Sequence, residues 1–76
     1  MQKLTKRFIE AIKPGAGDLF EWDAEVKGFG VRVKPSGRKS FVVQYRTVGN
    51  LSRRLTIGPH GVFTPETARA RARDLL

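Results

Sequence analysis

Apolar and polar side chains alternate along the middle of the chain in three short runs, 29–34, 41–46 and 52–57. Such alternation is typical of strands with one face in a core and the other face in solvent. Tight turns rich in Gly, Pro and Asn separate the runs. The pattern therefore predicts a three-stranded antiparallel sheet with an aliphatic and aromatic face and a polar, basic face.

The parity of the apolar residues also predicts how the strands face each other. Placing Val33 opposite Phe41 leaves a five-residue connection at 35–39, which contains turn-forming Pro and Gly. In the second hairpin only a three-residue loop, 48–50, keeps the apolar side chains on one face, with a positive φ at its second or third residue. The expected pairs across this hairpin are Phe41 with Ile57, Val42 with Thr56, Val43 with Leu55, Gln44 with Arg54, and Arg46 with Ser52.

Two segments precede the sheet. Residues 4–13 carry apolar side chains at helical spacing behind Thr5, a suitable N-cap, and predict a short helix. Residues 18–23 predict either a short edge strand or an extended arm. Trp22 is interpreted as a core anchor rather than a platform for nucleic-acid bases, because the surrounding acids would repel phosphate.

A helix is expected after the sheet, with Thr64 as its N-cap and Pro65 at its first position. Its inward stripe consists of Ala68, Ala72, Leu75 and Leu76, and its outward residues include Arg69, Arg71 and Arg73. No Gly or Pro stop signal ends this helix, so we expect the chain to be a fragment of a longer protein.

These elements predict one α+β domain over residues 1–76. A three-stranded antiparallel sheet packs against a C-terminal helix, with a short N-terminal helix and a possible short edge strand.

The net charge of +8 is distributed unevenly along the chain. Five cations and five acids cancel in residues 1–27, whereas residues 28–63 contain seven cations and no acid. A lopsided basic surface indicates a polyanion partner, although a generally basic surface remains the alternative. The seven cations are Arg32, Lys34, Arg38, Lys39, Arg46, Arg53 and Arg54.

Catalytic and cofactor chemistry is missing from the sequence. There is no cysteine, and the single histidine, His60, stands in a Gly-Pro turn without a carboxylate to orient it, so it is interpreted as a turn residue. No apolar run approaches the roughly 20 residues that span a bilayer. We therefore expect a soluble, non-enzymatic domain with no catalytic residue, metal, cofactor, small-molecule substrate or membrane partner.

The basic face suits DNA, because the major groove admits a two-stranded ribbon whose side chains reach base edges. The residues expected to read bases are Arg32, Gln44, Arg46, Arg54 and Thr56. The residues expected to contact phosphates are Lys34, Arg38, Lys39 and Arg53. A solvated basic face and a protein-interaction module remain alternatives. RNA binding is less favoured, because RNA-binding sheets stack bases on exposed aromatics, whereas Phe29, Phe41 and Tyr45 share the apolar face.

The elements GFGVRV, PSGRKSF, QYR and TIG, followed by ARARARDLL, occur in an order and spacing that resemble a known family. The chain is similar to the N-terminal arm-binding domain of phage-type tyrosine recombinases, the integrases of prophages and genomic islands. The resemblance implies that the sheet binds arm-type sites in double-stranded DNA through the same five base-reading residues. It further implies DNA integration and recombination in the bacterial cytoplasm and nucleoid, with other integrase subunits or accessory recombination proteins as further partners. The family's catalytic residues belong to a separate domain, and Tyr45 matches none of its motifs.

Overall fold

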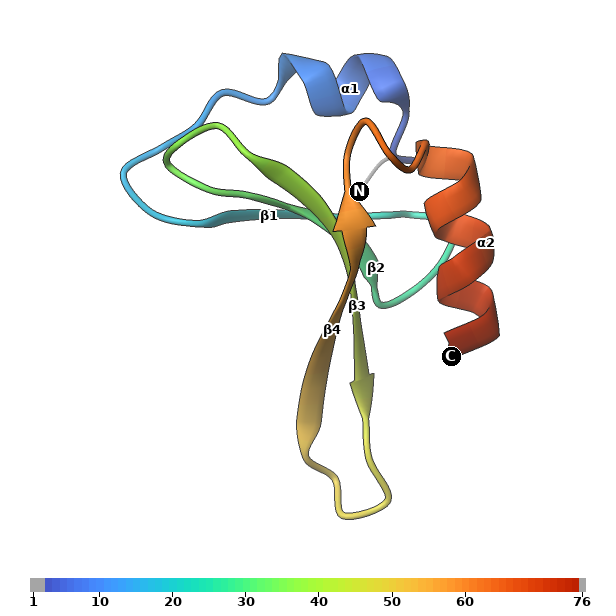
Figure 1. The fold of residues 1–76 in the computed structure, drawn as a ribbon. Helices are drawn as coiled ribbons and strands as arrows, with labels where there is room; N and C mark the ends of the chain where they lie inside the picture. Colours follow the sequence, from blue (N-terminus) through green and yellow to red (C-terminus); the bar gives the residue numbers. More distant parts are fainter. Residues whose placement is uncertain (1–2, 76) are drawn as a thin grey trace.

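A computed structural model describes residues 3–75 of the chain, and its fold is α+β. All four strands form one antiparallel sheet in the order β1-β2-β3-β4 (Figure 1). The expected number of three strands is wrong, because segment 18–23 takes its strand alternative and adds an edge strand. The elements are α1 (Lys6–Ala11), β1 (Leu19–Trp22), β2 (Phe29–Val33), β3 (Lys39–Arg46), β4 (Ser52–Pro59) and α2 (Pro65–Leu75).

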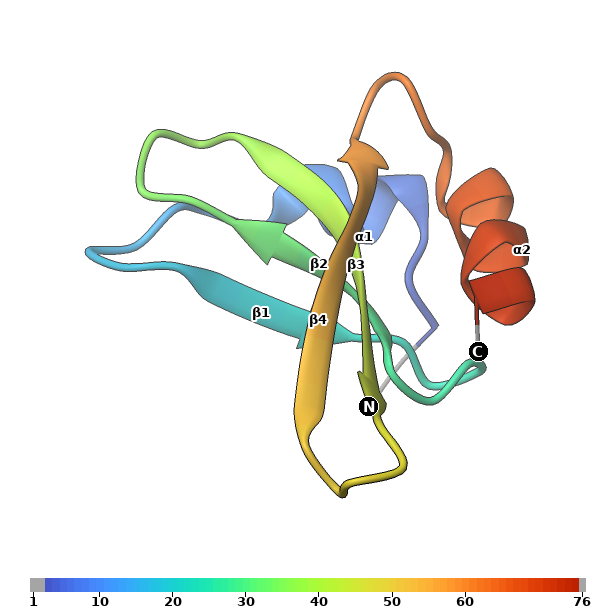
Figure 2. The same ribbon diagram turned by 60° about the horizontal axis from the view of Figure 1, so that its bottom comes forward.

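The core lies between the sheet and both helices. Side chains at alternate positions of β2 and β3 meet residues of α1 and α2, so both helices cover the same face of the sheet. In Figure 2, α1 lies behind the strands. The buried cluster consists of Leu4, Ile9, Val26, Phe29, Val31, Phe41, Val43, Ala68 and Ala72.

The β2–β3 hairpin is two residues tighter than expected. Gly37 donates its N–H to the Lys34 carbonyl at 2.8 Å and adopts a φ of 93°, while the Lys34 N–H is bonded to the Arg38 carbonyl at 2.9 Å. The loop is therefore Pro35-Ser36-Gly37, a type of three-residue connection in which Gly supplies the positive φ. The expected pairing of Val33 with Phe41 is wrong, and the observed pairs are Phe29 with Val43, Val31 with Phe41, and Val33 with Lys39.

The β3–β4 hairpin has the expected three-residue loop. The Thr47 N–H donates to the Leu51 carbonyl across this loop at 2.9 Å, and Asn50 adopts the positive φ of 64°. The pairs from Val42–Thr56 to Arg46–Ser52 are confirmed. A β-bulge then shifts the register, so Phe41 lies opposite Gly58 rather than Ile57. Phe63 packs against Gly58 at this bulge, so closely that a Cβ added to Gly58 would lie 2.4 Å from the Phe63 ring.

The α2 helix begins as expected after Thr64, whose hydroxyl oxygen accepts the Thr67 N–H at 3.1 Å. Ala68 and Ala72 are completely buried against the sheet, whereas Leu75 is 38% exposed. Leu76, the last member of the expected stripe, lies outside the described residues.

The expectation that Arg69 faces outward from α2 is wrong. Its side chain is buried and donates to the carboxylate of Asp23 and to the Leu4 carbonyl. An arginine can occupy this interior because a carboxylate neutralises it and oxygen atoms accept its N–H groups. The interaction ties α2 to the end of β1 and to the segment before α1.

Candidate nucleic-acid interface

The sheet face opposite the helices carries polar and basic side chains in register. Antiparallel pairing aligns Gln44 with Arg54 and Val42 with Thr56, and paired residues point to the same side of a sheet. Arg46 shares this face by its parity in β3, is exposed, and donates to the Asn50 side chain at 3.3 Å. The expected base-reading residues of β3 and β4 therefore lie on the face away from the core.

The β3–β4 hairpin projects beyond both helices as a two-stranded ribbon (Figures 1 and 2). At its tip Val48 is fully exposed and Leu51 is 60% exposed. The helices pack on the other face of the sheet, and on the basic face Arg46 and Arg54 are exposed while Gln44 is half-buried.

Two aromatic rings also lie on this basic face. Phe20 pairs with Arg32 and Trp22 pairs with Gly30, which places both rings opposite the core. The rings stack with centroids 5.8 Å apart at an angle of 7°. A Cβ at Gly30 would lie 2.6 Å from the Trp22 ring, so only glycine lets the indole lie on the sheet. The interpretation of Trp22 as an anchor of the core is therefore wrong.

Phe20 brings two of the expected base-reading arginines together. The guanidinium carbon of Arg54 lies 4.3 Å from the ring centroid, and that of Arg32 lies 5.9 Å from it. Arg32 is also paired with Asp18, whose Oδ2 accepts from Nε at 2.9 Å and from Nη2. Both guanidinium groups thus lie over the Phe20 ring, and that of Arg32 is also paired with the Asp18 carboxylate.

The expected phosphate contacts fall into two groups. Lys34 and Arg38 are exposed where the β2–β3 turn closes. Lys39 pairs with Val33 on the core side, and its ammonium group donates to the Glu10 carbonyl at 3.4 Å. Arg53 pairs with Tyr45 and shares the parity of the core face, beyond the part that the helices cover. Lys39 and Arg53 therefore lie on the opposite face from Arg54.

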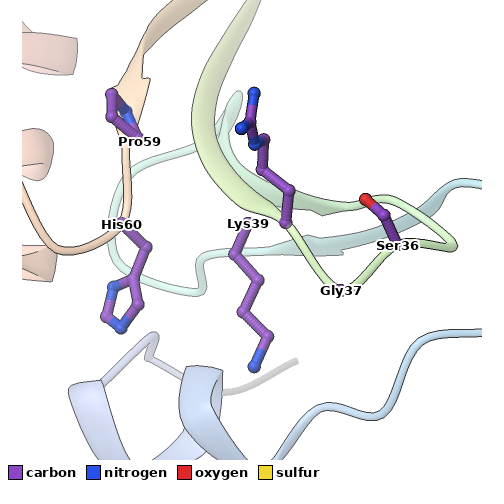
Figure 3. Close-up of a pocket in the computed structure, with 6 residues that line it drawn as sticks. Ser36, Gly37, Lys39, Pro59 and His60 are labelled. Carbon is purple, nitrogen blue, oxygen red and sulfur yellow. The ribbon is translucent and has the colours of Figure 1, made fainter.

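Two hollows flank the sheet. One of about 580 Å³ lies on the α1 side, where Lys39 and His60 extend toward that helix (Figure 3). His60 packs edge-on against Phe41, and its Nδ1 is buried without a hydrogen-bond partner among the described residues. The other, of about 1050 Å³, is lined by Trp22, Gln44 and Arg46, and also by Lys27. In the sequence, Lys27 is one of the five cations that the acids of residues 1–27 balance, and it was not a predicted site residue.

A family model described as an arm DNA-binding domain matches residues 4–76. The chain belongs to the arm DNA-binding domain family. Domains of this family are found in phage integrases, so the resemblance drawn from the sequence is confirmed. Membership gives this arm DNA-binding domain double-stranded DNA as its partner. A comparison with curated proteins gave no match.

Residues 3–75 contain no group of three or more His, Cys, Asp or Glu side chains placed to hold a metal ion. None of the described helices has the length and apolar character needed to cross a membrane.

The position of Phe20 and Trp22 on the basic face of the arm DNA-binding domain was not predicted from the sequence. The shared parity of Phe20 and Trp22 was visible, but the face to which they belong depends on the pairing of β1 with β2. Gly30 was the available signal, since a glycine inside a strand often marks a close approach by another group. The placement also weakens the argument against RNA, although the ring of Phe20 is already covered by Arg54.

Proposed function

We propose that this domain binds specific sequences in double-stranded DNA by inserting the basic face of its sheet into the major groove. The observation that carries this proposal is the alignment of Gln44, Arg46, Arg54 and Thr56 on one face of a projecting ribbon. The domain would deliver a longer integrase, a tyrosine recombinase of a prophage or mobile element, to arm sites in the bacterial cytoplasm. Catalysis of recombination would belong to another domain of that protein.

Groove dimensions support this mode of binding. The major groove of B-DNA is about 12 Å wide and accepts a two-stranded β-ribbon. A guanidinium group can donate two parallel hydrogen bonds to guanine, and a glutamine amide can form two bonds with adenine. Arg54 and Gln44 would supply one group of each type from directly opposite positions, and Thr56 offers a hydroxyl and a methyl group further along β4.

Phosphate contacts would come from the margins of the face. Lys34 and Arg38 at the β2–β3 turn are exposed and could contact the phosphates of one DNA strand beside the groove. Lys27 lines the hollow next to Arg46 and would supply a further contact. No acid lies between residues 28 and 63, so this part of the chain offers no fixed negative charge against the backbone.

Neighbouring arginines on opposite faces of β4 provide a matched test. Arg54→Ala should weaken binding to a duplex selected from a random library by about 1–3 kcal/mol and reduce sequence discrimination. Arg53→Ala removes the same charge from the other face and should weaken all duplexes by the same small factor. Fluorescence anisotropy with the selected duplex and a scrambled duplex measures both effects. Equal losses for the two variants on both duplexes would contradict base reading by this face.

Contact with other integrase subunits or accessory recombination proteins is a second candidate function. The exposed apolar side chains of Val48 and Leu51 at the ribbon tip favour it. Following backbone amide signals during a titration with duplex separates the two functions. Shifts along β3 and β4 on the basic face support DNA binding, whereas no shift on this face favours a protein partner at the ribbon tip of Val48 and Leu51.

A further inference from the structure

We propose that Asp18 and Phe20 are positioning residues that fix the guanidinium groups of Arg32 and Arg54 and thereby set sequence discrimination. This inference rests on the proposed function, because it specifies how the same face distinguishes bases from bare phosphate. Neither residue lies in the basic stretch of the chain, and both belong to the edge-strand segment 18–23.

The geometry of the Asp18–Arg32 pair leaves the base-reading edge of the guanidinium free. A guanidinium group has five N–H donors in one plane, on Nε, Nη1 and Nη2. Asp18 Oδ2 accepts from Nε at 2.9 Å and from Nη2, which occupies the side edge of the group. The end edge, formed by Nη1 and the second N–H of Nη2, remains available for two parallel bonds to guanine. Asp18 thus orients Arg32 without occupying the donors that would read a base.

Phe20 acts on Arg54 in a comparable way. A guanidinium carbon 4.3 Å from a ring centroid is within the range of a cation–π contact, which uses the face of the group. All five N–H donors lie in the plane of the guanidinium and are not consumed by this contact. Phe20 can therefore restrict the rotamers of Arg54 while the N–H donors of Arg54 stay free.

Positioning of this kind affects specific and non-specific binding differently. A side chain that is already ordered loses less conformational entropy when it contacts a base, so specific binding strengthens. The Asp18 carboxylate also repels phosphate, which penalises any arrangement in which Arg32 contacts only the backbone. Both effects raise the ratio of specific to non-specific affinity, and neither requires Asp18 to touch DNA.

Asp18→Asn and Glu21→Gln form the matched comparison. Each variant neutralises one acid of the β1 segment, but Glu21 pairs with Val31 and lies on the opposite face from Phe20. With a duplex selected from a random library and its scrambled form as probes, the affinity ratio should fall roughly two- to tenfold in Asp18→Asn. The ratio should be unchanged in Glu21→Gln. If Asp18→Asn instead strengthens binding to both duplexes equally, the carboxylate acts only through net charge and the proposal is wrong.

Phe20→Leu and Phe20→Tyr test the ring. Leucine removes the aromatic face and should lower the affinity ratio, whereas tyrosine retains the face and should restore it. Thermal unfolding of each variant gives the fraction of protein that is folded at the temperature of the binding measurements, and the affinities are calculated from this folded fraction. A ratio that is lowered by both substitutions, or by neither, would contradict a positioning role for the ring.

A measurement on the free protein separates this inference from the proposed function. The Nε–Hε resonance of Arg32 should shift and exchange faster with water in Asp18→Asn, but should not change in Glu21→Gln. If the wild-type domain does not discriminate between duplexes, the proposed function fails, but the shift and exchange rate of this resonance still decide whether Asp18 positions Arg32. An Nε–Hε resonance that is the same in Asp18→Asn would overturn the positioning role.

Discussion

Arg69 and Asp23 form a bidentate ion pair, although they are 46 positions apart in the sequence. Their side chains are only 5% and 0% exposed, respectively. Arg69 Nε donates to one carboxylate oxygen at 3.1 Å and Nη2 donates to the other at 3.0 Å. Leu4 contributes its N–H to Asp23 and its carbonyl to Arg69. Three separate parts of the chain therefore meet at one buried group of hydrogen bonds.

Removing one partner of this pair should be strongly destabilising. Arg69→Ala leaves an uncompensated carboxylate in the interior and should lower the free energy of unfolding by about 3–5 kcal/mol. A domain of this length has a total stability on the order of 4–11 kcal/mol, so the variant should lose a large share of it and unfold at a much lower urea concentration. Urea denaturation followed by circular dichroism measures the change.

Arg71→Ala is the matched control for Arg69→Ala. Arg71 is exposed on the same helix, and its removal should change stability by no more than about 0.5 kcal/mol. Equal urea midpoints for Arg69→Ala and Arg71→Ala would show that the buried pair contributes no net stability.

The same pair predicts a loss of stability in acid. Burial by itself raises the pKa of Asp23, but hydrogen bonds from Arg69 and from the N–H groups of Leu4 and Val26 outweigh it and hold the pKa below its usual value. A carboxyl group whose pKa is lower in the folded state stabilises the protein above its unfolded pKa of about 3.9, and this contribution disappears as the pH falls through the folded pKa. Urea midpoints should therefore fall steeply below about pH 4.

Glu25 provides the control for the pH dependence. Lys3 and then Arg73 lower the pKa of Glu25 through hydrogen bonds at the surface. Glu25→Gln removes this contribution and should leave the acid loss that depends on Asp23. If the urea midpoint of Glu25→Gln no longer changes below about pH 4, Asp23 is not the group responsible.

Replacing Gly58 in β4 should lower the stability of the domain, because the Phe63 ring packs directly against it. In Gly58→Ala the new methyl group would overlap the Phe63 ring at the bulge, and overpacking of this kind costs about 1–3 kcal/mol. Gly17→Ala is the control, because nothing lies within 4 Å of its position. Calorimetry should show a lower Tm for Gly58→Ala only, and equal Tm values would mean that the ring moves aside without cost.

The sequence predicted the faces of the sheet better than its registers. Alternation assigns each side chain to a face, and a shift of two residues keeps that assignment, so apolar pattern alone could not distinguish Val33–Phe41 from Val31–Phe41. The decisive feature was the Pro35-Ser36-Gly37 loop, whose local hydrogen bonds close the hairpin earlier. The second hairpin was predicted correctly near its loop, where only one loop length preserved the faces.

Long-range partners were the part that the sequence could not supply. Asp23 and Arg69 each look like surface residues in their own segment, and burial becomes favourable only when the fold brings them together. The same holds for Phe20, whose contacts with Arg32 and Arg54 cross the sheet. Local rules of parity and capping therefore predicted most of the elements, while the groups that connect them required the tertiary structure.

Lys34 and Lys39 should respond differently to salt if DNA lies on the basic face. Lys34 is exposed at the turn, whereas Lys39 lies on the core side and donates to the Glu10 carbonyl. Each phosphate contact adds about 0.9 to the slope of log affinity against log salt, so Lys34→Ala should reduce that slope by about 1. Lys39→Ala, with the same loss of charge, should leave the slope nearly unchanged. A slope that falls equally in both variants would mean that phosphates are contacted from the α1 side as well, and the orientation of the sheet in the groove would have to be reversed or tilted.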